Sequence, residues 1–287
     1  MIKIFVGSTP QQELVLKVLI WSVLKHTQEE VEFHPLHKFQ IPSELPKNPS
    51  NRPGTPFSFQ RFMIPQIVGY SGKALYLDCD QIVFKDIAIL YKKDMKNRGV
   101  LGTNVGFWKK DKRLLPSSVM LLDCENLDWD IRQIIRKLDD GQLNYVDLFS
   151  LANYPHRISS RWNSLDRYFK GYTALLHYTA KSKQPWIHHK HPLAYLWFEY
   201  LFQAIETGHL SLQEIYQAVD LGYVRPSIRY QVKHRICDPR QLPPEIKELD
   251  QEFIQTCAKY RFNSVPGEYR SQPKMETTVC NLGGDSP

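Results

Sequence analysis

The sequence lacks several features that would assign a function class directly. Its five cysteines are widely separated and form no CxxC pair, which argues against a disulfide framework and a zinc site. No run reaches the roughly 18 apolar residues of a membrane span. The first seven residues carry one lysine before a short apolar run and no small-residue cleavage site, so they predict a strand and not a signal peptide. We expect a cytoplasmic protein, with peripheral contact at the inner membrane face left open.

Motifs for nucleic acid, nucleotide hydrolysis and acyl transfer are also missing. There is no Walker sequence, no GxGxxG after the first strand and no RNA-binding aromatic signature. The formal net charge is +7, but the basic residues are scattered and form no long run, so we expect solvated surface charge and no nucleic-acid partner. The histidine-rich segment at 188–191 precedes Pro192, and we expect a solvated loop there.

What is present is the pattern of an α/β protein. The chain has 287 residues, of which 42% are hydrophobic, enough for a sizeable core. An apolar strand at 2–6 and an amphipathic helix at 11–25 form an opening βα unit. Further strands are predicted at 31–36, 74–77, 99–102, 118–122 and 174–178, and helices at 59–68, 130–138, 192–206, 211–219 and 244–259. We expect a catalytic domain over 1–190, a helical C-terminal extension over 191–262 and a disordered tail over 263–287.

The candidate site is a pair of aspartates. Asp78 and Asp80 follow the apolar run Ala74-Leu75-Tyr76-Leu77, so they end a buried strand, where ligands bind in open α/β sheets. Residues two apart on a strand share a face, and two carboxylates there are costly without a counter-ion. A hard divalent cation, Mg²⁺ or Mn²⁺, removes that cost and can bind a diphosphate.

The wider context of this pair resembles glycosyltransferase family 8, the glycogenin-like group. The resemblance rests on the segments Phe59 to Pro65, Ala74 to Asp80 and Phe84 to Ile87, followed by Arg161-Trp162-Asn163. The segment from His177 to Trp186 is similar to the family's His-x-x-Gly-x-x-Lys-Pro-Trp signature. The similar segments lie in collinear order over about residues 1 to 190.

This resemblance implies a GT-A-type, Rossmann-like mixed sheet flanked by helices. It also implies a retaining hexosyltransferase that moves a sugar from a UDP-sugar to an acceptor hydroxyl, the acceptor being a saccharide or a lipid-linked molecule. Mn²⁺, with Mg²⁺ as the alternative, would be held by Asp78, Asp80 and His177. The implied donor-binding residues come from the loop after the first strand, from the segment with the two aspartates, and from two basic side chains. They are Val6, Gly7, Ser8, Arg61, Asp78, Cys79, Asp80 and Lys183. Gln142 is the implied catalytic residue near the donor sugar, together with both aspartates.

The sequence also departs from the family pattern. Ala180 stands where the family has glycine, Gln184 is inserted before Pro185, and Pro116 falls where an asparagine-containing segment is expected. Two alternatives therefore stay open: a nucleotide-sugar-binding protein of the same fold without turnover, and a metal-dependent nucleotidyltransferase.

Overall fold

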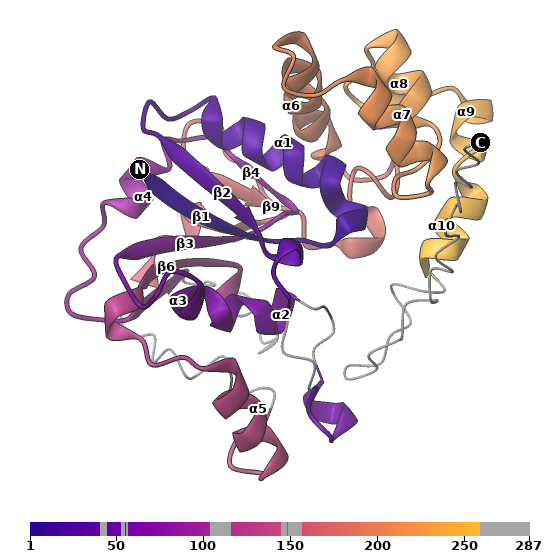
Figure 1. Ribbon diagram of the computed structural model, residues 1–287. Coiled ribbons are helices and arrows are strands. Elements are labelled where there is room, and N and C mark those ends of the chain that lie inside the picture. Colours follow the sequence, from indigo (N-terminus) through magenta and orange to yellow (C-terminus); the bar gives the residue numbers. More distant parts are fainter. Residues whose placement is uncertain are drawn as a thin grey trace, which may run out of the picture.

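The computed structural model describes residues 1–40, 45–52, 55, 57–103, 116–144, 148 and 157–258. Its centre is a six-stranded sheet with the order β2-β1-β3-β6-β5-β7 (Figure 1). The strands are β1 (Ile2–Gly7), β2 (Val31–Pro35), β3 (Lys73–Asp78), β5 (Val100–Thr103), β6 (Val119–Asp123) and β7 (Arg157–Ile158). β1 pairs in parallel with β2 and β3, whereas β6 is antiparallel to both β3 and β5. The predicted mixed sheet is confirmed.

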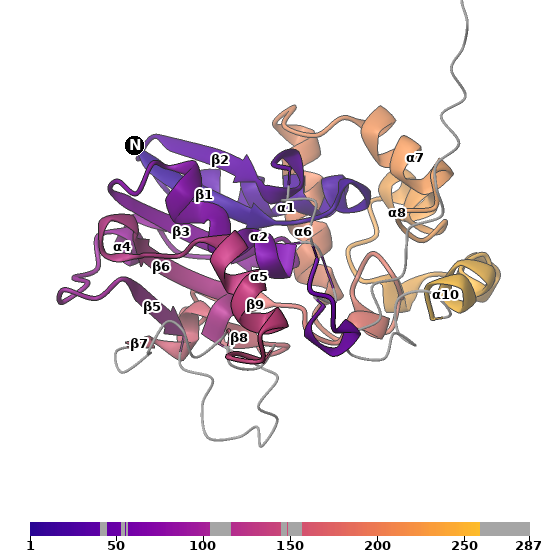
Figure 2. The same ribbon diagram turned by 60° about the horizontal axis from the view of Figure 1, so that its bottom comes forward.

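Both faces of this sheet are buried, because alternate side chains of a strand point to opposite sides. Ile4 and Val6 join one apolar cluster, to which α1 (Glu13–Leu24) and α6 (Ala194–Glu206) contribute. Phe5 and Tyr76 belong to a second cluster with α2 (Phe57–Gln60), α3 (Ile64–Ile67) and α5 (Ile131–Asp139). Figure 2 shows α1 and α5 on opposite sides of the strands. This double cover explains why the strands have near-continuous apolar runs.

A second, three-stranded sheet has the order β4-β9-β8, formed by β4 (Gln81–Val83), β9 (Leu175–His177) and β8 (Ser164–Leu165). The sequence pattern predicted the middle strand but neither of its neighbours, which have three and two residues. Such short strands show no periodicity of their own. They matter for the site because the register pairs Gln81 with His177.

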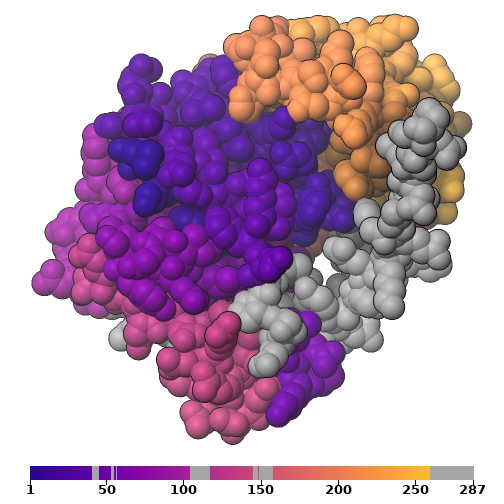
Figure 3. All heavy atoms as spheres, in the orientation of Figure 1, coloured from indigo at the N-terminus to yellow at the C-terminus, as the bar shows by residue number. Residues whose placement is uncertain are grey.

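The C-terminal helices pack directly on the α/β part. They are α6, α7 (Leu212–Asp220), α8 (Ile228–His234), α9 (Pro244–Glu248) and α10 (Gln251–Cys257). The remaining short helix, α4 (Ala88–Tyr91), is not one of them and follows β4 in the α/β part. One apolar cluster includes α1 residues such as Val15 together with Trp197 of α6 and Ile215 of α7. In the space-filling view these helices continue the surface of the α/β part (Figure 3). No helix within the described ranges is long and apolar enough to cross a membrane.

Two helix predictions need correction. The segment predicted as one helix at 59–68 is α2 and α3 with a 3₁₀ turn at Arg61–Met63 between them. The segment 244–259 does not form a single helix, because α9 and α10 are separated at Leu249 and Asp250. The Asp250 carboxylate is fully buried and accepts hydrogen bonds from the Ser227 backbone N–H at 2.9 Å and the Ser227 hydroxyl at 2.7 Å. Arg225 Nη1 lies 3.5 Å from the same carboxylate. This tertiary contact is invisible to helical periodicity. The predicted tail at 263–287 lies outside the described residues.

Candidate active site

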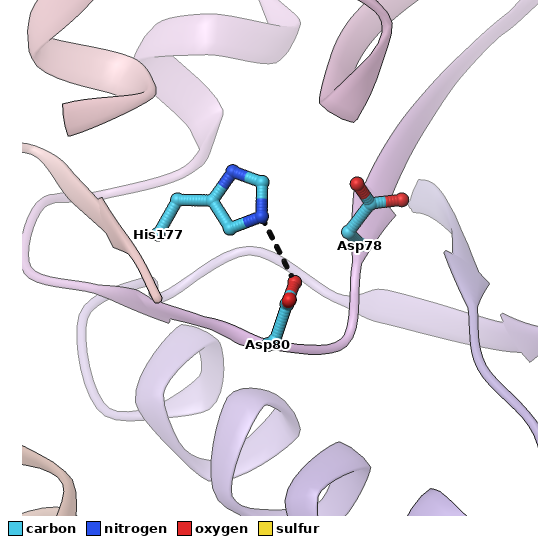
Figure 4. Close-up of side chains that lie close together, drawn as sticks. All are labelled: Asp78, Asp80 and His177. Atoms are coloured by element: carbon cyan, nitrogen blue, oxygen red, sulfur yellow. Dashed lines mark ion pairs between the residues drawn. The ribbon is translucent and has the colours of Figure 1, made fainter. Parts of the chain in front are cut away.

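The two aspartates and a histidine meet where the two sheets join. Asp78 ends β3, and the chain then turns through Cys79 and Asp80 into β4. The Tyr178 backbone N–H, just after β9, donates to the Asp80 carbonyl at 3.0 Å. This contact brings His177, the last residue of β9, beside the aspartates (Figure 4). One ligand atom from each of Asp78, Asp80 and His177 lies within 4.8 Å of the other two, so the predicted metal-ligand set does come together.

Asp78 is held through one oxygen. The Tyr76 hydroxyl donates to Asp78 Oδ1 at 2.5 Å, and Arg61 Nη2 lies 3.6 Å from the same oxygen. Arg61 is buried, stacks over the Tyr76 ring at 4.5 Å and donates from Nη1 to the Ser117 carbonyl at 2.8 Å. Burial raises the pKa of Tyr76 well above its usual value, so its hydroxyl stays protonated as a donor. These contacts fix the carboxylate through Oδ1 and leave Oδ2 as its second possible ligand atom.

Asp80 shows the same arrangement with different partners. Gln184 donates from Nε2 to Asp80 Oδ2 at 2.8 Å and to the Tyr178 carbonyl, also at 2.8 Å. Asp80 Oδ1 is buried and makes no hydrogen bond of proper geometry among the described residues, although His177 Nε2 is only 3.0 Å away. A buried carboxylate oxygen without a donor is costly. A cation between this oxygen and the imidazole would remove that cost.

His177 is oriented by its other ring nitrogen. His177 Nδ1 lies 2.9 Å from Asn163 Oδ1, and Asn163 donates from Nδ2 to Thr103 Oγ1 at 3.0 Å. Because the amide nitrogen is used toward Thr103, its oxygen faces the ring, and Nδ1 is the protonated nitrogen. Nε2 therefore faces Asp80 Oδ1, 3.0 Å away, where it can carry a proton paired with the carboxylate or, with the proton lost, offer its lone pair to a metal ion.

The charge around His177 favours a cation. Burial by itself lowers the pKa of His177, but the attraction of Asp80, Asp78 and Asp166 outweighs it, so the net pKa is raised. The same negative potential that holds a proton attracts a divalent ion. The residues present therefore fit a metal with two carboxylate oxygens and one imidazole nitrogen.

The end of β1 lies next to this cluster. Gly7 pairs with Asp78 in the sheet, and the Cys79 backbone N–H donates to the Gly7 carbonyl at 3.0 Å. A Cβ on Gly7 would lie 2.1 Å from the Tyr76 hydroxyl oxygen and 2.9 Å from Phe57 Cδ2. Only glycine therefore allows the Tyr76 hydroxyl to reach Asp78. Val6 and Ser8 flank this position, both buried, and Ser8 Oγ lies 2.9 Å from His37 Nδ1.

The loop after β9 carries Lys183 and is anchored by Asp166. The Thr179 backbone N–H donates to Asp166 Oδ1 at 2.9 Å, and His191 Nε2 lies 3.1 Å from the same oxygen. Burial acts to raise the pKa of Asp166, but hydrogen bonds from His191 and Thr179 outweigh it and lower the net pKa. Lys183 is exposed at the end of a 3₁₀ turn, and its backbone N–H donates to the Ala180 carbonyl. Its ammonium group is thus available to a ligand.

Gln142 lies elsewhere in the fold. It is exposed in the turn that follows α5, where its backbone N–H donates to the Lys137 carbonyl at 2.9 Å. Its catalytic role stays a prediction.

The residues that orient the ligands were not identified as such from the sequence. Tyr76 was assigned only to a buried strand, Asn163 only to a motif resembling the family, and Gln184 only to an insertion. Each acts through one side-chain contact over a different sequence separation: two residues for Tyr76, 14 for Asn163 and 104 for Gln184. In the structure these residues stand out as polar side chains at buried positions, since Asn163 and Gln184 are 4% and 7% exposed. The sequence shows the polarity but not the burial.

Comparison with known proteins gives the affiliation. The family model "Glycosyl transferase family 8" matches residues 8–123, the stretch that contains β3 and both aspartates. This match covers less than half of the chain, and the matched segment is similar to glycosyl transferase family 8. The relative Protein CDI of Arabidopsis thaliana is 34% identical over 91 residues, which are 30% of this chain and 34% of that protein. The chain thus matches about a third of the length of this relative.

Solved structures agree on the fold. The galactosyltransferase LgtC, in a complex with donor and acceptor sugar analogues, superposes with a TM-score of 0.50 at 17% identity, covering 73% of this chain and 100% of that one. The glycosyltransferase GlyE of Streptococcus pneumoniae gives a TM-score of 0.50 at 15% identity, covering 74% of this chain and 66% of GlyE. At such identities the likeness concerns the fold alone. The family 8 region thus lies in a GT-A-type fold, as the sequence predicted.

Proposed function

We propose that the protein is a retaining glycosyltransferase that moves a sugar from a UDP-sugar to the hydroxyl of a saccharide or lipid-linked acceptor. The observation that carries this proposal is the arrangement of Asp78, Asp80 and His177. In each residue one atom is held by a protein partner. One possible ligand atom of each residue lies within 4.8 Å of those of the other two. Such outer-shell fixation is typical of metal sites in proteins.

The proposed ion is Mn²⁺, with Mg²⁺ as the alternative. An imidazole nitrogen beside carboxylate oxygens favours Mn²⁺, because Mg²⁺ prefers oxygen ligands alone. When bound, the ion would neutralise the donor diphosphate and stabilise the departing UDP. Asp78 and Asp80 would hold the ion through their carboxylates, and His177 through Nε2.

The remaining donor contacts follow from position. Val6 and Gly7 end β1 beside Asp78, and Ser8 follows directly; these residues would bind the nucleoside, largely through backbone groups. The exposed ammonium of Lys183 would contact the diphosphate as a point charge. Arg61 is committed to Asp78 and Ser117, so we assign it the orientation of Asp78 more than direct donor contact. Cys79 is buried between the aspartates and would contribute backbone groups.

Retention is proposed without a protein nucleophile. The bond between the sugar C1 and the diphosphate would break with Lys183 near the departing UDP, leaving an oxocarbenium-like sugar. The acceptor oxygen would bond to C1 from the same face while its hydroxyl proton passes to the departing phosphate. A catalytic role for Gln142 is carried over from the family resemblance alone, because its exposed turn after α5 lies outside the aspartate cluster. We propose a cytoplasmic location with peripheral contact at the inner membrane face, which suits a lipid-linked acceptor, and no nucleic-acid partner.

The test is a donor panel. The protein would be incubated with Mn²⁺ and each of several UDP-sugars, and products followed by proton and phosphorus NMR. The proposal predicts slow release of UDP and a free sugar whose first-formed anomer keeps the donor configuration. Release of pyrophosphate would instead support the nucleotidyltransferase. Metal-dependent UDP binding without any product, even with candidate acceptors, would support a binding protein. No UDP binding at all would refute the proposal.

A further inference from the structure

A pocket lies between the histidine-rich loop at 188–191 and the helices α9 and α10. Its volume is about 300 Å³. The loop contributes His188, His189 and Lys190, and the helices α9 and α10 contribute Lys247, Gln251 and Gln255. We refer to this site as the basic pocket. Its volume is at the lower end of the range for small-molecule sites, roughly 300–1,000 Å³.

The loop is more buried than the sequence suggested. We expected 188–191 to be solvated, but His191 is 2% exposed and His188 and His189 are partly buried. The rings of His188 and His189 contact each other edge to face at 4.4 Å between centroids. The Nδ1 atoms of both rings are buried without a hydrogen-bond partner in the part of the chain that the structure describes. The nitrogen that each ring can offer to a ligand is therefore Nε2.

The electrostatic potential of the basic pocket is positive. Lys190 and Lys247 carry two positive charges against the single negative charge of Glu248, which also lines the pocket. The buried Arg225 lies near both histidines, although Asp250 balances its charge. Burial, and then the positive charges of this surrounding, lower the pKa of His188 to about 4. Both rings are thus neutral hydrogen-bonding groups in a field that attracts anions.

The side-chain amides add neutral donors. Gln251 and Gln255 are four residues apart on α10 and so share one face of the helix. With the imidazoles and two ammonium groups, the basic pocket has more donors than acceptors. Donors around a positive potential are the chemistry that binds phosphate oxygens.

The basic pocket is close to the aspartate cluster. The His188 backbone N–H donates to the Gln184 carbonyl at 2.9 Å, and the Gln184 side chain donates to Asp80 at 2.8 Å. A single residue therefore connects the pocket wall to the cluster.

We propose that the basic pocket binds the phosphate group of a small molecule, either free phosphate or a phosphate monoester. Lys190 and Lys247 supply the charge, and the His188 and His189 Nε2 atoms and the two amides supply directional hydrogen bonds. The proposal stands apart from sugar transfer, because none of the lining residues belongs to the proposed donor or metal site.

The test is an NMR titration of the full chain, with isotope-labelled histidine. Inorganic phosphate is added in one series and glycerol 3-phosphate in another. It is done in EDTA, so that no metal draws phosphate to the aspartate cluster, and at constant ionic strength set with chloride. His188→Gln and His189→Gln assign the two C2–H resonances. We expect the chemical shifts of both resonances to change in a saturable way. The ligand that binds more tightly shows whether the pocket prefers free phosphate or a phosphate ester.

Variants separate the pocket from general surface charge. Lys190→Ala combined with Lys247→Ala should weaken binding by about five-fold or more, as expected for loss of two partly solvated charges. Lys233→Ala, an exposed lysine of α8 outside the pocket lining, should leave the affinity unchanged. Shifts that do not saturate, that chloride reproduces, or that Lys233→Ala weakens as much would overturn the proposal. Asp80→Asn should leave phosphate binding intact, whatever it does to UDP binding.

Discussion

Replacing Gln184 by Met tests how the metal ligands are oriented. The Gln184 amide uses both N–H groups, one toward Asp80 Oδ2 and one toward the Tyr178 carbonyl, each at 2.8 Å. This leaves Asp80 Oδ1 facing His177 Nε2. Methionine keeps the length and volume of the side chain and removes both donors, so the change isolates the hydrogen bonds from packing.

The magnitude follows from the type of contact. A hydrogen bond to a charged group contributes about 1.5–3 kcal/mol, and losing an outer-shell partner lowers metal affinity by about 10- to 100-fold. The Asp80 side chain is 17% exposed, so water can replace part of the lost bond. We therefore expect the low end, about tenfold weaker Mn²⁺ binding.

The assay is electron paramagnetic resonance of free Mn²⁺ at constant UDP concentration, with urea unfolding in parallel. Gln203→Met is the matched control, because Gln203 accepts a hydrogen bond from Lys25 on the exposed side of α6. Mn²⁺ affinity within about twofold of wild type in a folded Gln184→Met protein would refute the orienting role.

Three further predictions concern other parts of the account. Because the pKa of His177 is raised, its proton competes with the ion, so Mn²⁺ affinity should fall as the pH drops from about 8 to about 5.5. A Mn²⁺ affinity that stays constant over this pH range in titration calorimetry would contradict this prediction. Asp250→Asn should lower the free energy of unfolding in urea by about 3–5 kcal/mol, since it breaks a buried ion pair with Arg225, and an unchanged urea midpoint would argue against it. Gly7→Ala should cost about 1–3 kcal/mol of stability by overpacking and weaken Mn²⁺ binding, because the new Cβ displaces the Tyr76 hydroxyl from Asp78; unaltered Mn²⁺ binding would show that this hydroxyl does not orient Asp78.

The sequence predicted those parts of the fold and site that depend on local patterns. The apolar run before Asp78 predicted a buried strand, and the aspartate spacing placed both carboxylates at its end. His177 was found only through the family resemblance, because a lone histidine in a strand has no pattern of its own. The structure then placed it beside Asp80 through pairing of β4 with β9.

The parts that could not be predicted depend on tertiary contacts. Gln184 reads as a simple insertion until the fold brings its amide to Asp80. The break between α9 and α10 follows from burial of Asp250 against Ser227, whereas the local sequence favours one continuous helix. The ordered histidine loop likewise depends on contacts with elements distant in the sequence, such as the hydrogen bond of His191 with Asp166.

The most direct test of sugar transfer is UDP release from the most active UDP-sugar, measured with Mn²⁺, with EDTA, and after Mn²⁺ is restored. Asp80→Asn is compared with Asp86→Asn, because Asp86 lies outside the aspartate cluster and its carboxylate accepts a hydrogen bond from the Ala88 backbone N–H at the start of α4. We predict activity that EDTA abolishes, that added Mn²⁺ restores, and that Asp80→Asn loses while Asp86→Asn retains it. Release that persists in EDTA, or that Asp80→Asn leaves intact, would contradict a metal-dependent glycosyltransferase built on this cluster.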